Sequence, residues 1–94
     1  MNAQEATLNI AVNLGRLCRF ASEGKINRVK TFLEDTDQYM TILSDAKMNP
    51  RFSKTYKRFL SVYKQLKNSN DYSYDWADTA LTWANILQHR AKLA

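Results

Sequence analysis

The scarcity of turn-forming residues restricts the fold of this chain more than any other feature. Only two Gly and one Pro occur among 94 residues. A fold of many short strands needs turn signals at intervals of about 8–12 residues, and these are missing. No stretch alternates apolar and polar residues over a sustained length, as a half-buried strand would. The sequence therefore predicts an all-α protein with few connections.

Four segments repeat apolar residues at the three- and four-residue spacing of one helix face. They cover about residues 3–22, 25–47, 50–67 and 72–93. The members of these stripes that we expect in the core are Leu14, Leu17, Leu33, Leu43, Phe52, Tyr56, Phe59, Trp76, Trp83 and Leu87. Gly15 lies within the first stripe, and we expect it to mark a close contact with another helix, because glycine otherwise weakens a helix.

Short connections separate the four predicted helices. Gly24 suits the left-handed residue that ends many helices, and Asn49 followed by Pro50 is a typical helix start. The third connection begins at residues 68–70, and Asp71 or Ser73 would cap the last helix. Short loops favour antiparallel neighbours, so we expect one domain over residues 1–94 forming an antiparallel four-helix bundle. Two tandem helical hairpins are the alternative, although no internal repeat supports them.

Positive charge is concentrated in the third predicted helix. The net charge of the chain is +5, yet residues 47–67 hold seven Lys and Arg and no acidic residue. The other three segments are each neutral or slightly acidic. This basic helix gives the candidate binding residues, which are Arg51, Lys54, Lys57, Arg58, Lys64 and Lys67.

Such a helix has several interpretations. It suits an acidic face on another protein, a nucleic acid or an anionic membrane surface. It is also compatible with a solvated face that acidic residues on the second and fourth helices partly neutralise, namely Glu34, Asp35, Asp37, Asp71, Asp75 and Asp78. A single row of cations reaches only about four or five phosphates, which gives weak, salt-dependent binding. We therefore expect a protein-interaction or adaptor module, with a nucleic-acid-binding bundle as the alternative.

Residues for catalysis or metal binding are sparse. The chain has one cysteine, Cys18, and one histidine, His89, on different predicted helices. No pair of ligands has zinc spacing, no Glu precedes a His by three residues, and no glycine-rich phosphate loop occurs. We expect no enzymatic activity, no cofactor and no metal ion.

Apolar runs, cysteine content and the two tryptophans bear on location and assembly. We expect no secretory signal, because residues 1–10 contain no Lys or Arg and no long apolar run. The longest apolar run of the chain is only Ile10–Val12, and its lone cysteine can form no internal disulfide. We expect a cytoplasmic protein without a transmembrane segment. Trp76 and Trp83 lie seven residues apart on one helix face, so they could belong to the core or to an interface, and a homodimer is possible.

Overall fold

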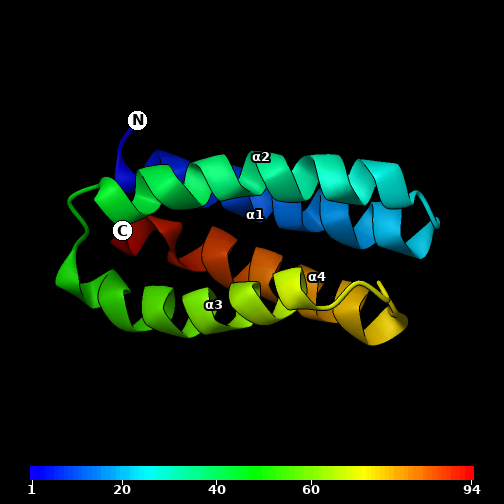
Figure 1. The fold of residues 1–94 in the computed structure, drawn as a ribbon. Helices are drawn as coiled ribbons and strands as arrows, with labels where there is room; N and C mark the ends of the chain where they lie inside the picture. The colour runs from blue at the N-terminus through cyan, green and yellow to red at the C-terminus, as the bar shows by residue number, and fades with distance from the viewer.

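The computed structural model describes all residues from 1 to 94 and contains helices only. The helices are α1 (Ala3–Ser22), α2 (Ile26–Asp45), α3 (Pro50–Asn68) and α4 (Tyr74–Arg90), and a short 3₁₀ turn, η1 (Ala91–Leu93), follows. Consecutive helices run in opposite directions, and both chain ends lie at the same end of the bundle (Figure 1). The predicted antiparallel four-helix bundle is confirmed.

Local sequence signals set both ends of α1. Asn2 and Glu5 bond reciprocally as a capping box at the start of α1. At its end Gly24 has φ +71°, and its N–H donates to the Ala21 carbonyl at 3.1 Å. The N–H of Lys25 donates to the Phe20 carbonyl at 2.9 Å. These two bonds form a Schellman motif, so Gly24 terminates α1 as predicted.

The second helix pair also begins at polar caps. The Asn49 side chain accepts a bond from the Arg51 N–H at 2.9 Å, and Pro50 is the first helical residue. Ser73 caps α4 by accepting from the Trp76 N–H at 3.3 Å. The helix therefore starts at Tyr74, two residues later than the periodicity predicts, because Ser73 supplies the cap.

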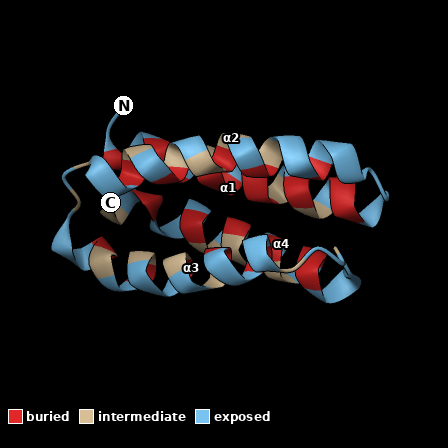
Figure 2. Ribbon diagram, viewed as in Figure 1, coloured by how far each residue is buried: buried red, intermediate tan, exposed pale blue.

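Helix α1 is the central helix, since it packs closely against both α2 and α4. Both α1 and α4 bury several alanines, and such small side chains are compatible with the close approach of the two backbones. The buried alanines of these helices are Ala3, Ala6, Ala11, Ala21, Ala77, Ala80 and Ala84. In Figure 2 the buried residues lie on the sides of the helices that face the middle of the bundle.

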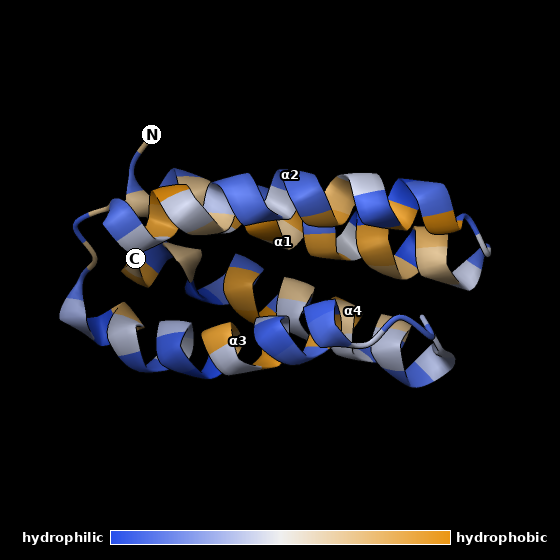
Figure 3. Ribbon diagram, viewed as in Figure 1, coloured by the Kyte–Doolittle hydropathy of each residue, from blue (hydrophilic) through white to orange (hydrophobic).

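Helix α3 is held at a greater distance, because large side chains fill the space between it and its neighbours. Phe52 and Phe59 are fully buried, and Tyr63 is almost so. The Phe59 ring lies 5.7 Å from the Tyr63 ring and 5.6 Å from the Trp83 ring, centroid to centroid. Aromatic packing therefore attaches α3 to the bundle, while its outer surface is mainly hydrophilic (Figure 3).

Most predicted core residues are buried, but two are only partly so: Tyr56 and Trp83. They lie at the edges where α3 meets α2 and α4, and the wider spacing of α3 leaves these edges open. The expectation for Gly15 is wrong, because a Cβ atom placed there would meet nothing within 4 Å. Gly15 occupies an open position on α1 rather than a close helix contact.

Candidate binding surface

All six cations predicted as binding residues are exposed along α3. At 3.6 residues per turn they do not form one row. Arg51 and Arg58 lie on the side of the helix toward α4, whereas Lys64 and Lys67 lie on the side toward α2. Lys57 lines neither of these two edges. The structure therefore divides the basic helix into two sides with different surroundings.

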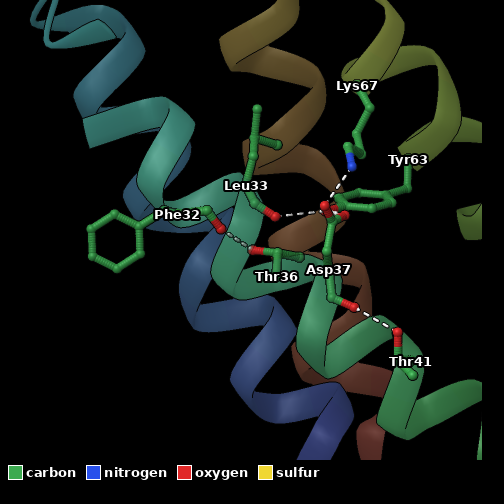
Figure 4. A network of polar contacts seen from close by, with 7 residues as sticks. All are labelled: Phe32, Leu33, Thr36, Asp37, Thr41, Tyr63 and Lys67. Carbon is green, nitrogen blue, oxygen red and sulfur yellow. Dashed lines mark hydrogen bonds and ion pairs between the residues drawn. The ribbon is translucent and has the colours of Figure 1, made fainter. Parts of the chain in front are cut away.

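On the side toward α2, Lys67 belongs to a polar network (Figure 4). Its ammonium pairs with one carboxylate oxygen of Asp37, and the Tyr63 hydroxyl donates to the other at 2.7 Å. The Leu33 carbonyl lies 3.2 Å from the same hydroxyl. Burial, and then the adjacent Asp37 carboxylate, raise the pKa of Tyr63 far above its usual range. Lys67 is therefore part of the contact between α2 and α3.

On the side toward α4, α3 and α4 enclose a hollow of about 320 Å³ that we name the cationic hollow. Four of its residues come from α3 and three from α4, and none is acidic. They are Arg51, Lys54, Thr55, Arg58, Trp83, Ile86 and Arg90. The hollow thus places four positive charges around one partly enclosed space, with a small apolar wall.

Arg90 is the cation that sequence reasoning missed. Its Nη1 donates to the Thr55 hydroxyl at 3.4 Å, which holds the guanidinium across the opening between the helices. The fourth helical segment has a slightly acidic total charge, and that total conceals how its charges separate. Asp75 and Asp78 lie near the start of α4, whereas Arg90 lies in its last turn. Counting the charges turn by turn, rather than summing them over the whole segment, would have indicated Arg90.

The two tryptophans of α4 have different surroundings. Trp76 is buried, and its Nε1 donates to the Leu66 carbonyl at 2.9 Å. Trp83 is only partly buried, packs one side against Phe59, and lines the cationic hollow with another. No buried polar side-chain atom lacks a partner, so the indole N–H of Trp83 is not a buried, unpaired donor. Trp76 is a core residue, and Trp83 joins the core to the candidate surface.

Partial neutralisation of α3 by neighbouring acids, the alternative interpretation of its charge, is limited to one ion pair. The only acidic side chain that pairs with an α3 cation is Asp37, through Lys67. Asp35 instead accepts a bond from the Asn13 side chain at 2.8 Å. The cations around the hollow therefore have no carboxylate partner.

A second group of cations lies at the opposite end of the molecule. Phe20 of α1 and Phe32 of α2 stack with centroids 5.4 Å apart. The guanidiniums of Arg19 and Arg28 lie 4.7 and 5.3 Å from the Phe20 centroid, and that of Arg16 lies 5.3 Å from the Phe32 centroid. These arginines cover an aromatic pair and stabilise the contact between α1 and α2.

The remaining reactive side chains do not form a site. Cys18 lies near the end of α1 and His89 in the last turn of α4. Because these helices are antiparallel, the two side chains lie toward opposite ends of the bundle. No cluster of three or more His, Cys, Asp or Glu side chains could hold a metal ion. None of the four helices combines the length and apolar character needed to cross a bilayer.

Together these features define a four-helix bundle with a cationic hollow between two of its helices. Searches against models of known families, against characterised proteins and against solved structures find no significant match.

Proposed function

We propose that this protein is a non-enzymatic interaction module that binds an acidic face of another protein. The binding surface is the α4 side of α3, extended by the last turn of α4. The main support for this proposal is the lining of the cationic hollow, which includes four cations and no acidic residue. Like charges held together without counter-charges repel one another, and an acidic partner would relieve that repulsion.

The composition of the hollow also favours a protein partner. Trp and Arg are enriched at the energetically important centres of protein interfaces, where an aromatic anchor is surrounded by polar groups. Trp83 would serve as such an anchor, since Phe59 packs against it and Arg58 lines the same hollow. The support from Phe59 reduces the entropy that Trp83 would lose on binding.

The extent of the surface argues against nucleic acid as the main ligand. Arg51 and Arg58 are seven residues apart on α3, which corresponds to roughly 10 Å along the helix axis. A patch of that length neutralises few phosphates, so it would give weak binding that salt removes. Nucleic-acid binding by the same helix is the second candidate, because the cations around the hollow have no acidic partner.

Two triple variants of equal charge test the proposal. Arg51→Gln/Lys54→Gln/Arg58→Gln removes three cations of the hollow. Its control, Lys30→Gln/Lys57→Gln/Lys64→Gln, removes three exposed cations outside it. Circular dichroism and thermal unfolding would first establish that both variants fold.

Affinity capture from cell extract, with chemical cross-linking, then compares the wild type with both variants. A protein captured by the wild type and the control, and lost with the hollow variant, supports the proposal. Anisotropy titrations with duplex and single-stranded nucleic acid at low and moderate salt run beside it. Tight nucleic-acid binding that persists at moderate salt and needs the hollow would replace the protein partner with the second candidate. Equal losses in both variants would show that only net charge matters, and would refute a specific surface.

A further inference from the structure

The positive charge in the cationic hollow exceeds what a single carboxylate can balance. Arg51, Lys54, Arg58 and Arg90 all line one space of about 320 Å³. A carboxylate carries one negative charge, whereas a phosphorylated side chain carries about −1.5 to −2 at neutral pH and presents three strong acceptor oxygens. We infer that the cationic hollow is a site for a phosphoryl group, carried on a phosphorylated side chain of the partner protein.

The donors in the hollow suit such a group. Three of the four cations are arginines, whose planar guanidiniums bind phosphate oxygens through two parallel bonds. They come from both helices, so they reach the space from two directions: Arg51 and Arg58 from α3, and Arg90 from α4. Arg90 is already oriented by the Thr55 hydroxyl at 3.4 Å, a long contact that a charged oxygen would readily replace.

The remaining walls accommodate the group that carries the phosphate. Trp83 and Ile86 form an apolar wall beside the cations. The space is larger than a phosphoryl group alone, so the side chain bearing the phosphate would lie against the indole ring. The arginines over Phe20 and Phe32 at the other end of the bundle offer no comparable site, because their guanidiniums lie over rings that already pair with each other.

This inference rests on the proposed function, because it specifies which acidic group the partner presents. Its test uses small probes and does not need the partner. The full chain, labelled with ¹⁵N, gives two indole N–H signals, from Trp76 and Trp83. Phenyl phosphate and benzoate are titrated at constant ionic strength, so that screening is equal and only the charged group differs. We expect saturable shifts of the Trp83 signal, with a dissociation constant about tenfold lower for phenyl phosphate.

Single variants locate the site. We expect Arg58→Gln and Arg90→Gln each to weaken phenyl phosphate binding about tenfold, because each removes a charge-assisted donor. Arg58→Lys should keep only part of the affinity, since it preserves charge but not the two-bond geometry. The matched control is Lys57→Gln, which removes one exposed cation of α3 outside the hollow and should change affinity less than twofold.

A pair of peptides then identifies the source of the phosphate. A peptide containing phosphotyrosine or phosphoserine should bind more tightly than its Glu-substituted form and more tightly than a nucleoside 5′-monophosphate. Tighter binding of the nucleotide would overturn the inference that the phosphate is carried on a protein.

Equal affinity for benzoate and phenyl phosphate would also overturn the inference. So would a loss of affinity in Lys57→Gln as large as that in Arg58→Gln or Arg90→Gln, or signal shifts that never saturate. The proposed function would survive such a result if the partner were still captured through the hollow. If the wild type captured no protein partner in any assay, although it still preferred phenyl phosphate to benzoate, the proposed function would be refuted instead.

Discussion

The contact between Tyr63 and Asp37 should contribute measurably to folding stability. Tyr63 has only 4% of its surface exposed, so most of its side chain has no contact with water in the folded state. It donates to the Asp37 carboxylate at 2.7 Å, and bonds to charged acceptors are worth about 1.5–3 kcal/mol. Asp37 is partly exposed and keeps Lys67 as a partner, so water can replace part of the lost bond. We therefore expect Tyr63→Phe to lower the free energy of unfolding by about 1–2 kcal/mol.

Urea denaturation followed by circular dichroism measures this loss, and the dependence on urea should stay unchanged if the ring still packs. The same loss lowers Tm by about 5–12 °C in a domain of this size. A double-mutant cycle with Asp37→Ala isolates the pair, and we expect a coupling of about 1–2 kcal/mol. Lys67→Met is the comparison, because it removes only the exposed ion pair and should cost about 0.5 kcal/mol or less.

Two results would contradict this reasoning. A cost below about 0.3 kcal/mol for Tyr63→Phe would mean that the bond adds nothing beyond the water bonds it replaces. A coupling near zero would mean that the hydroxyl depends on the Leu33 carbonyl, 3.2 Å away, rather than on Asp37.

Further predictions concern backbone, packing and pH. Gly15→Ala should stabilise the protein by about 0.5–1 kcal/mol, because Gly15 lies in a helix and has space for a Cβ atom. Gly24→Ala should destabilise it by about 1 kcal/mol, because φ is +71° there. Urea denaturation should show changes of opposite sign for the two variants. Trp83→Ala should lower the free energy of unfolding by about 1–3 kcal/mol, because Trp83 is only partly buried. Trp76→Ala should lower it by about 3–5 kcal/mol, because Trp76 is buried. Equal losses would show that Trp83 is a core residue. The raised pKa of Tyr63 keeps its hydroxyl protonated in the folded state, while in the unfolded chain it ionises near its ordinary value of about 10. The stability that the Tyr63 hydroxyl contributes is therefore fully present below about pH 10 and is lost as the pH rises further. Tyrosinate absorbance in an alkaline titration should show one tyrosine that ionises only when the protein unfolds. Tyr63→Phe should lack this tyrosine. Ionisation of all five tyrosines before unfolding would contradict the prediction.

The helices and their order could be predicted from the sequence because each signal acts locally. Gly24, Asn49 and Pro50 act through their own backbone and nearest bonds, which sequence spacing specifies directly. The start of α4 follows less directly from the sequence, because Asp71 and Ser73 are both capping residues, and Ser73 is the one that caps the helix.

The candidate site was predicted only in part, because it depends on distances between helices. Periodicity places Trp83 on the apolar stripe but does not reveal that α3 is held away from α4, which leaves Trp83 at an open edge. For the same reason Lys67 could not be separated from the other cations before its contact with Asp37 was known. Arg90 was missed because its segment has a slightly acidic total charge.

The wide spacing of α3 has a consequence for local unfolding. Regions attached by side chains alone, with few close backbone contacts, open more often than closely packed ones. Amide hydrogens of α3 should therefore exchange with deuterium faster than those of α1, which packs closely against two neighbours. The helix that carries most of the cationic hollow is thus also the element most able to detach briefly. A ligand bound across α3 and α4 would slow the exchange of those amides, and the effect would keep growing as its concentration rises above its dissociation constant.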